Sequence, residues 1–466
     1  MMTNWLPDIA ARKGPRYIAI AQRIADAIED GSLPEGARLP THRDLAWRLG
    51  VTVGTVTRAY AEAERMGLIG GEVGRGTFVR AIRGAPATFF PNPNDQEGPE
   101  TGLPLDRNYP STPLAAASLS RTLAEFAKSD QLGALMAYAP RAGIARHSMA
   151  GAKWMRRIGF DAVPERTLIT AGSQHALAVC LSALAKPGDT LLTESLTWGG
   201  IKALAGIYRI RVQGLPMDQD GLRPDAFESA ARDCVSRVVY LNPTLHNPTT
   251  IIMPDKRRRE IAAIAERFGI FVIEDDIYGP LLDPPATPIA AHAPNHGLYV
   301  AGTSKTLGPG LRVAFVHAPE RLVPTLTTSL RATATMAAPM LAEIVSRWID
   351  DGTAEACTRA ERGEIRARQA IAKRVLRDAE IETRPESLHL WMSLPEPWRA
   401  DEFVAAARIE GVNVTAAEAF AAGRAQAPHA VRVCLGAVPD RNSLEKGLGI
   451  LAGLLAGAPA SRAVAF

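Results

Sequence analysis

From about residue 107 onward, short apolar runs rich in β-branched residues alternate with segments of helical periodicity, and this alternation restricts the fold most strongly. Residues 166–170 predict a strand and residues 174–185 a helix. Further strands are expected at 189–193, 237–241, 270–274, 298–301 and 312–316, with a helix over 255–268. Apolar strands separated by helices are typical of a mixed, mostly parallel sheet covered on both faces, so the expected class is α/β.

A polar break at residues 81–106, rich in proline and glycine, divides the chain. It leaves little room for helix or strand, so we expect a semi-extended linker between one domain at 1–80 and another at 107–466. After a long helical stretch, strands in the second domain predict a smaller C-terminal α+β part at 388–394 and 430–435.

Composition excludes some classes of protein. The net charge of the 466 residues is only +4, so charge alone does not indicate nucleic-acid binding. The four cysteines are scattered without metal-type spacing, which predicts reduced thiols and no metal site. The N-terminus lacks the apolar core of a signal peptide, and no stretch is apolar for long enough to span a bilayer. We therefore expect a cytoplasmic protein that does not enter the membrane.

Residues 15–80 carry the periodicity of a small helical module. One amphipathic helix ends near Gly31, and a second begins at Thr41, whose spacing to Asp44 resembles a capping box. After a tight turn at Gly50, a third helix begins. Two short helices about a tight turn predict a helix-turn-helix, and residues 68–79 predict a β-hairpin wing.

The order and spacing of these pieces resemble the winged helix-turn-helix domain of the GntR regulator superfamily. The matching pieces include Arg38-Leu39-Pro40, Arg43-Asp44-Leu45-Ala46 and the closing Gly74-x-Gly76-Thr77-Phe78-Val79. The resemblance implies double-stranded operator DNA as a partner, faced by Arg43, Thr52, Thr55, Arg58 and Arg75. Taken singly, Arg43 or Arg58 is about equally well a solvated helix charge, and Thr52 could be only an N-cap.

A second motif surrounds Lys305, in Gly302-Thr303-Ser304-Lys305-Thr306-Leu307-Gly308-Pro309-Gly310-Leu311-Arg312. A lysine among small residues can form a Schiff base with the aldehyde of pyridoxal 5'-phosphate. Arg312, seven positions on, can pair with the phosphate of that cofactor. A surface lysine in a glycine-rich loop would be the better interpretation if this motif stood alone.

Other stretches supply what the same cofactor needs. Its ring nitrogen requires a carboxylate, and Asp275 follows the strand at 270–274, at the sheet edge where open α/β sheets bind ligands. Asp276 is the alternative, but the spacing from Asp275 to Tyr278 favours Asp275, with Tyr278 reaching the phenolic oxygen. Backbone N–H groups at a helix start would take the phosphate at Gly172-Ser173-Gln174.

Together these stretches resemble the fold-type-I aminotransferases from about residue 108 to 460. The resemblance implies that Asn247, in Asn242-Pro243-Thr244-Leu245-His246-Asn247-Pro248-Thr249, donates to the phenolic oxygen. It implies that Trp198 stacks on the cofactor ring, although a buried core tryptophan is almost as good an interpretation. It also implies that Arg432 grips a substrate carboxylate. Tyr138 is similar to the tyrosine that reaches the phosphate of the partner subunit, which implies a homodimer.

One departure from the aminotransferase pattern concerns the phosphate. The residue three before the lysine is often Ser or Thr, whose hydroxyl contacts the phosphate, but here it is Gly302. Thr303 or Ser304 could replace that contact, and the sequence does not decide between them.

Joined to the GntR-type domain, the chain resembles the MocR-type regulators. The favoured function is a pyridoxal phosphate-dependent, DNA-binding transcription regulator that senses a small amino compound. The alternative is an active aminotransferase acting on an amino acid, since Lys305, Asp275, Asn247 and Arg312 are all present. The winged helix-turn-helix favours the regulator, because an enzyme gains nothing obvious from a module that reads DNA.

Overall fold

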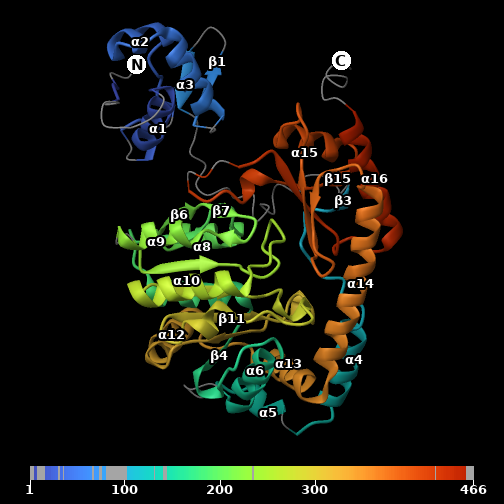
Figure 1. The fold of residues 1–466 in the computed structure, drawn as a ribbon. Coiled ribbons are helices and arrows are strands. Elements are labelled where there is room, and N and C mark those ends of the chain that lie inside the picture. The colour runs from blue at the N-terminus through green and yellow to red at the C-terminus, as the bar shows by residue number, and fades with distance from the viewer. Residues whose placement is uncertain are drawn as a thin grey trace. The chain divides into compact units, whose positions relative to one another are not determined.

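The computed structural model describes residues 5–7, 16–29, 32–34, 36–65, 68–72, 76–79, 102–130, 132–139, 144–233, 236–423, 425 and 427–457. The chain forms two compact units, Met1–Ala85 and Pro86–Phe466 (Figure 1). One predicted domain lies in each unit. Most of the predicted linker, residues 81–101, lies outside the described residues.

The first unit is a winged helix-turn-helix, as predicted. Its elements are α1 (Arg16–Glu29), α2 (His42–Leu49), α3 (Val53–Arg65) and the antiparallel pair β1 (Ile69–Glu72) and β2 (Gly76–Val79). Thr41 Oγ1 accepts a hydrogen bond from Asp44 N at 3.2 Å and so caps α2. Gly50 ends α2 with a left-handed φ of 60°, a conformation that costs glycine little. The buried Tyr60 donates to Pro40 O at 2.7 Å, which ties α3 to the segment before α2.

The second unit is built on a seven-stranded sheet of order β4-β12-β11-β10-β9-β5-β6. The strands are β4 (Thr167–Thr170), β5 (Thr190–Glu194), β6 (Arg211–Leu215), β9 (Val238–Leu241), β10 (Phe271–Asp275), β11 (Gly297–Gly302) and β12 (Ala314–His317). Within this sheet β12 runs opposite to the other six strands, so the mixed, mostly parallel sheet is confirmed. The connection between β11 and β12 contains the short 3-10 helix Pro309–Leu311 in place of the α-helix that a parallel crossover usually uses.

Strand β6 has no counterpart among the strands expected from the sequence. It lies at the edge of the sheet, and its residues are mostly exposed or half-buried, so it lacks an apolar run. Gly214 within it is required by packing, because a Cβ there would lie 2.7 Å from Ala422 O. An edge strand of this composition resembles a loop in sequence. The short hairpin of β7 (Met217–Asp218) and β8 (Gly221–Leu222) follows it.

Helices cover both faces of the sheet, because successive strand residues point to opposite sides. Tyr240 and Ile273 pack towards α7 (Ser173–Leu184), α8 (Gly199–Ile207) and α12 (Val323–Ala334). Val239 and Val272 pack towards α9 (Pro224–Arg232), α10 (Asp255–Phe268) and α11 (Ile289–His292). The bounds of α10 are those expected from the sequence.

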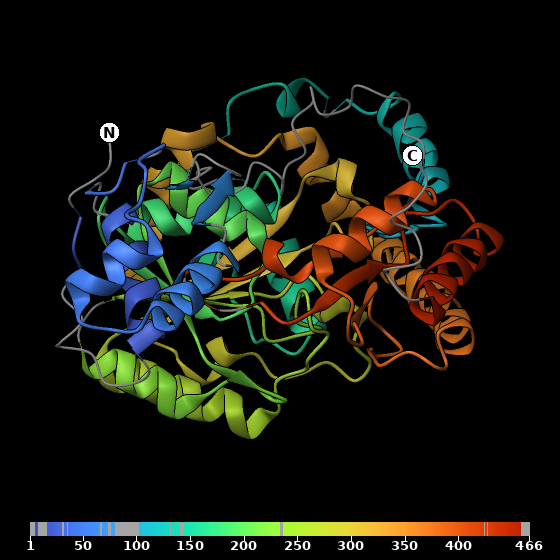
Figure 2. The same ribbon diagram turned by 90° about the horizontal axis from the view of Figure 1, so that it is seen from above.

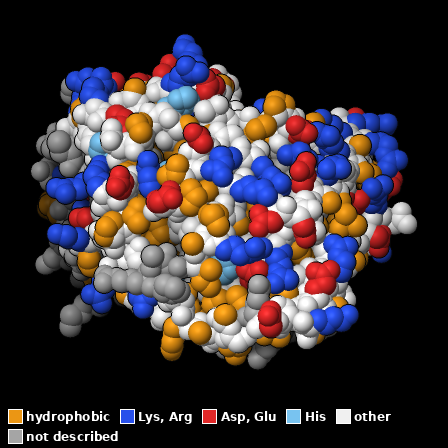
Figure 3. Space-filling model, turned by 90° about the horizontal axis from the view of Figure 1, so that it is seen from below, with side chains coloured by type: hydrophobic (Ala, Val, Ile, Leu, Met, Phe, Trp, Pro, Cys, Tyr) orange, Lys and Arg blue, Asp and Glu red, His pale blue; other side chains and the backbone are white. Residues whose placement is uncertain are grey.

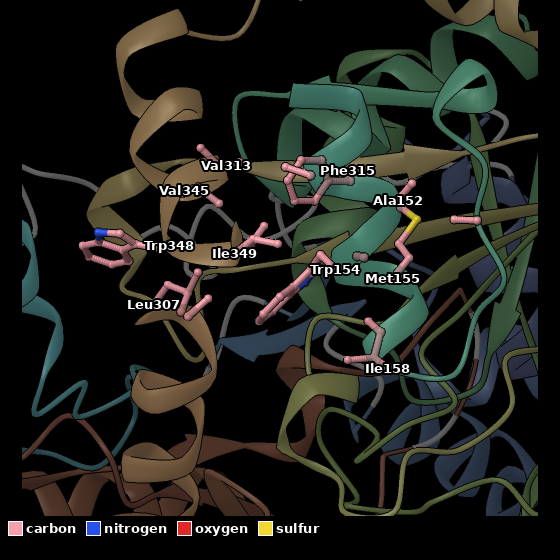
Figure 4. Packing of buried hydrophobic residues seen from close by; sticks show 14 of the residues in the cluster. Ala152, Trp154, Met155, Ile158, Leu307, Val313, Phe315, Val345, Trp348 and Ile349 are labelled. Carbon is pink, nitrogen blue, oxygen red and sulfur yellow. The ribbon is translucent and has the colours of Figure 1, made fainter. Parts of the chain in front are cut away.

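A further core joins β12 to the helices beside it. Phe315 packs with residues of α6 (Ala145–Arg157) and α13 (Pro339–Asp351). Figure 4 shows Trp154 and Met155 of α6 on one side of this core and Trp348 and Ile349 of α13 on the other. The short helices α4 (Ala115–Phe126) and α5 (Leu132–Leu135) precede α6 in the chain.

The C-terminal part is α+β, as expected. Its sheet has the order β13-β14-β17-β16, from β13 (Ile381–Glu382), β14 (His389–Ser393), β17 (Ala430–Cys434) and β16 (Thr415–Ala416). Its helices are α14 (Thr353–Val375), α15 (Ala400–Ile409) and α16 (Arg441–Ala456). Seen from above, this part, orange to red, lies beside the larger sheet (Figure 2). The long helical stretch expected before it is interrupted at Gly352, where φ is 89°.

One strand falls inside the predicted linker. Leu103–Pro104 form β3, which pairs in parallel with β15 (Val412–Asn413). The described residues of the segment 81–106 therefore belong to the second unit. This pairing could not be predicted from the sequence, because a two-residue strand containing proline has no periodicity to detect.

Charges on the surface are interspersed. On the face shown in Figure 3, basic and acidic side chains lie among one another, in keeping with the small net charge of +4. Within the described parts of the chain, no helix combines the length and the apolar character needed to cross a membrane.

A buried ion pair fixes the end of β10, where candidate site residues begin. Arg258 on α10 donates to Glu274 Oε1 at 3.2 Å, and both side chains are almost completely buried. The Glu274 carboxylate also accepts from Ile289 N at 3.1 Å and Ala290 N at 2.9 Å. Burial raises the pKa of Glu274 to about 7, while the Arg258 cation acts in the opposite direction. Removing Arg258 would therefore leave a buried carboxylate without its cation.

We expect Arg258→Ala to lower the free energy of unfolding by about 3–5 kcal/mol, because it breaks a buried pair. The matched control is Arg259→Ala, one residue along α10, whose pair with Asp255 is exposed. That loss should stay within about 0.5 kcal/mol. Urea unfolding of the full chain measures both values, and equal losses would contradict this role of the ion pair.

Candidate functional site

Asp275 ends β10 at the carboxyl edge of the parallel strands and is buried. Its Oδ2 accepts a hydrogen bond from the Tyr240 hydroxyl at 2.8 Å. Its Oδ1 is buried and has no partner within the described residues. Burial raises the pKa of Asp275 to about 7, and the Tyr240 hydrogen bond and the Lys305 cation oppose that shift. The unpaired oxygen could accept from a cationic N–H group, which would favour the ionised carboxylate.

Asp276, the alternative left open by the sequence, faces different groups. Its Oδ2 accepts from the Tyr299 hydroxyl at 2.6 Å. Burial raises the pKa of Asp276, and the groups that oppose this shift include Tyr299 and Arg258. Asp276 Oδ1, like Asp275 Oδ1, is buried without a partner among the described residues, so this feature does not separate the two. The Lys305 cation acts on the pKa of Asp275, and the alternation along β10 turns Asp276 to the other side, which favours Asp275 as the carboxylate on the Lys305 side.

Side chains from distant parts of the chain converge on the hydroxyl of Tyr278. That oxygen accepts from Asn108 Nδ2 at 2.8 Å and from Asn247 Nδ2 at 3.4 Å. Asn247 Oδ1 in turn accepts from Arg432 Nη1 at 2.8 Å. Burial raises the pKa of Tyr278, so this phenol is neutral and keeps a proton to donate.

Arg432 lies on β17 and is buried. Its Nη2 donates to Asp106 O at 2.7 Å, and its Nε has no partner within the described part of the chain. The guanidinium carbon lies 4.8 Å from the centre of the Phe420 ring. Lys202 Nζ donates to the two main-chain carbonyls on either side of Phe420, at 2.7 and 2.8 Å. This anchors the loop that supports the arginine.

Lys305 follows β11, and its side chain lies in the same site as Tyr278 and Arg432. Its Nζ donates to Asn108 O and lies 5.8 Å from the centre of the Tyr278 ring. Burial lowers the pKa of Lys305 to about 8, and the Arg432 and Arg312 cations lower it too. Near neutral pH, this amine is therefore neutral, and so nucleophilic, more often than an ordinary lysine.

The first turn of α7 and Arg312 form a second half of the site. Gly172 precedes α7 with a φ of 84°, and a Cβ there would lie 2.5 Å from the Arg312 guanidinium. Ser173 and Gln174 open the helix, where N–H groups have no acceptor within the helix. A cation beside free N–H groups at a helix start is suited to bind phosphate.

Ser173 also explains the departure at Gly302. A Cβ at Gly302 would lie 2.6 Å from Ser173 Oγ, so the serine hydroxyl lies where a side chain at 302 would stand. That hydroxyl is buried and unpaired among the residues described. Thr303 Oγ1 donates to Val313 O at 2.7 Å, so its proton is already used. Ser304 is half-buried beside Lys305.

The two predicted aromatic contacts lie in different surroundings. Trp198 is half-buried at the start of α8, with its indole over Gly200, and it also packs on the core beside α7. Both interpretations offered by the sequence thus remain compatible with its position. Tyr138 is 84% exposed, and none of the hydrogen bonds found within the described residues joins it to the site of its own chain.

The predicted DNA-facing residues lie on α2 and around the start of α3. Arg43, Thr52 and Arg58 are exposed, and Thr55 is half-buried. Thr52 Oγ1 accepts from Thr55 N at 3.2 Å, so Thr52 is an N-cap of α3, whatever else it contacts. Arg75 lies outside the described residues.

Sequence reasoning missed several site residues. Tyr240, Asn108 and His389 all bond to predicted site residues or to one another, and Asn108 Nδ2 also donates to His389 Nδ1 at 3.2 Å. Burial lowers the pKa of His389 to about 3, so this ring is neutral. No motif marks these positions. Only the alternation of residues along the strands could have placed Tyr240 on the same face as Asp275.

Two family models match the chain. Residues 16–79 match the gntR family of bacterial regulatory proteins, and residues 102–451 match aminotransferase class I and II. The HTH-type transcriptional regulator YdeF of Bacillus subtilis is 30% identical over 452 residues, covering 97% of each chain. The chain is a MocR-type regulator of the GntR family. It therefore binds DNA and regulates transcription, as the sequence predicted.

A further relative and a solved structure agree with this family and this fold. PtsJ of Salmonella typhimurium, a vitamin B6 salvage pathway transcriptional repressor, is 28% identical over 435 residues, covering 90% of this chain and 95% of PtsJ. An archaeal alanine:glyoxylate aminotransferase superposes with a TM-score of 0.70 at 20% identity, covering 84% of this chain and 98% of that one. This likeness confirms the aminotransferase fold of the second unit.

The cofactor implied by the aminotransferase class is pyridoxal 5'-phosphate, as predicted. The regulator's residues fit it. Asp275 Oδ1, Ser173 Oγ and Arg432 Nε are all buried and unpaired among the described residues. A pyridine N–H, a phosphate and a carboxylate are groups that could pair with these three atoms, in that order.

Gly172→Ala should weaken pyridoxal phosphate binding by about ten- to a hundredfold, because its Cβ would displace the Arg312 guanidinium from the helix start. Gly188→Ala is the matched control. It has a similar φ of 91° but nothing within 4 Å of the added Cβ, so it carries the backbone strain alone. Titration of the cofactor's absorbance measures both affinities. Equal weakening in the two variants would contradict the proximity argument.

Proposed function

We propose that the regulator binds pyridoxal phosphate at Lys305 and senses an amino compound whose carboxylate pairs with Arg432. The observation that carries this proposal is the convergence of Lys305, Asp275, Tyr278 and Arg432 within one hydrogen-bonded site. These residues come from four separate elements or loops. A site of this composition recognises an amine and a carboxylate on the same molecule.

Each residue has a distinct task in this proposal. Asp275 holds the proton on the ring nitrogen, because the buried carboxylate and a cationic N–H favour each other's charged forms. Tyr278 and Asn247 hold the phenolic oxygen. Bound there, pyridoxal phosphate supplies an aldehyde that bonds covalently to amines and a ring that withdraws electrons.

The phosphate would be held at the other end of the site. Arg312 supplies the charge, the N–H groups at Gly172-Ser173-Gln174 supply directional donors, and Ser304 is a further candidate. Trp198 would lie against the cofactor ring. Lys305, neutral more often than an ordinary lysine, presents the amine that bonds to the aldehyde.

The effector's amine would compete with Lys305 for the cofactor, and its carboxylate would pair with Arg432. A planar guanidinium suits this task, since it binds a carboxylate through two parallel hydrogen bonds. Phe420 and the loop anchored by Lys202 hold the guanidinium plane. An active aminotransferase needs the same residues, so slow transamination is the second candidate function.

In the first unit, we propose that Arg43, Thr52, Thr55, Arg58 and Arg75 face operator DNA. Arg43 and Arg58 would pair with phosphates or base edges, which makes binding dependent on salt. The site of action is the bacterial cytoplasm, where the DNA is.

We further propose a homodimer that completes each cofactor site. Tyr138 and the neighbouring Met136 are 84% and 77% exposed, a pair of large side chains that a partner subunit would cover. The Tyr138 hydroxyl would then reach the phosphate bound by the partner.

The regulator proposal predicts that a ligand changes DNA affinity. The dissociation constant of the wild type is measured for a duplex selected from a random library, without ligand, with pyridoxal phosphate, and with pyridoxal phosphate and each standard amino acid in turn. The constant should change when these ligands are added. Lys305→Ala should lose the borohydride-trapped adduct and any response to pyridoxal phosphate. Arg432→Ala should keep the adduct and lose the response to amino acids. Rapid transamination without any change in DNA affinity would favour the enzyme instead.

The dimer proposal predicts complementation between two defective variants. Tyr138→Phe should sediment as a dimer but bind the cofactor about ten- to a hundredfold more weakly, since a hydrogen bond to a charged group is lost. Lys305→Ala forms no adduct. Mixed dimers of the two should contain one intact site, and adduct at low cofactor concentration should return in about half the sites. A monomer in sedimentation, or no recovery on mixing, would refute the proposal.

A further inference from the structure

Residues 103–112, a segment that begins inside the predicted linker, pass through the candidate site. At one end, β3 pairs with β15, and Leu105 O accepts from Cys434 N at 2.7 Å. At the other end, Ser111 N, Ser111 Oγ and Thr112 N donate to the Glu361 carboxylate at 2.6–3.0 Å. The segment is therefore held at both ends by the second unit.

Between these two anchors, main-chain carbonyls accept hydrogen bonds from the cationic side chains of the site. Asp106 O accepts from Arg432 Nη2 at 2.7 Å, and Asn108 O accepts from Lys305 Nζ. Hydrogen bonds from a cation are stronger than those between neutral groups. Residues 106–108 thus interact with both side chains that the proposed function assigns to ligands.

The present arrangement leaves other polar atoms unsatisfied. Asn108 Oδ1 and Arg432 Nε are buried without partners within the described residues. A buried polar atom left unpaired is unfavourable, so a second arrangement that pairs these atoms need not be much higher in free energy. The segment therefore has the features of an element with two accessible states.

We infer that residues 106–108 are an internal competitor of the ligand: their carbonyls hold Lys305 and Arg432 until pyridoxal phosphate and the effector carboxylate take these groups. The inference rests on the proposed function and adds how that site is regulated. Ligand binding releases the two carbonyls and loosens the adjoining pairing of β3 with β15, while the anchor at Glu361 remains. Because β3 continues directly into the linker, this loosening is transmitted along the chain towards the DNA-binding unit.

This mechanism and a simple binding site predict different DNA affinities for a variant that lacks Lys305. If residues 106–108 only form a static wall, removing Lys305 leaves the regulator with the DNA affinity of the unliganded wild type. If they are a competitor, removing Lys305 frees Asn108 O and imitates the ligand. The ligand can change DNA affinity only by the difference between its affinities for the two states, typically 5- to 150-fold.

The first measurement is the DNA affinity of full-length variants without any ligand. Lys305→Met, which keeps the side-chain volume, and Arg432→Met should both move from the unliganded wild-type value towards the value of the wild type with pyridoxal phosphate. Arg374→Met is the control, because its exposed pair with Glu445 joins α14 to α16 and includes neither residues 106–108 nor Glu361. The control should keep the wild-type value. Variants that stay at the unliganded wild-type value would overturn the inference.

The second measurement is hydrogen exchange of peptides covering residues 103–112, which needs no DNA. Ligands ordinarily slow exchange in the segments they cover. Here pyridoxal phosphate should speed exchange in the wild type, and Lys305→Met should exchange fast without it. Slower exchange on adding pyridoxal phosphate would overturn this inference alone. Failure of the wild type to bind pyridoxal phosphate would overturn the proposed function, and the inference with it.

Discussion

Three consecutive carboxylates are buried at the end of β10, and the rest of the second unit is arranged around the need to neutralise them. Successive residues point to opposite sides, so Glu274 and Asp276 share one side and Asp275 faces the other. Arg258 is the cation on the first side. Tyr240 and Lys305 face Asp275 on the second. The strand end thus separates a structural ion pair from a site that can carry chemistry.

The fold was largely predictable because its signals are local. The helix over 255–268 and the cap at Thr41 are local patterns, and the structure has both. Strand β6 and the pairing of Leu103–Pro104 were not predicted, since each depends on a neighbouring strand that is distant in sequence. The same division applies to the site. Asp275 and Lys305 stand in recognisable motifs, whereas Asn108 acquires its place only through Tyr278 and His389, 170 and 281 residues away.

Burial shifts the pKa values of three groups in the site. The pKa of Lys305 falls to about 8, that of His389 falls to about 3, and that of Asp275 rises to about 7. Each shift brings the group nearer to its neutral form. With pKa values near neutrality, Lys305 and Asp275 change their charges readily, so an incoming pyridinium or carboxylate changes the electrostatics of the site strongly.

A Cβ at residue 302 would lie 2.6 Å from Ser173 Oγ and 2.8 Å from Ile277 Cγ2. A serine at 302 would therefore crowd both side chains, and a glycine at 173 alone would leave the site without a hydroxyl at this place. Moving this hydroxyl from one residue to the other by single substitutions therefore passes through a crowded or a hydroxyl-free variant. The effects of substitutions at residues 173 and 302 should for this reason depend on each other.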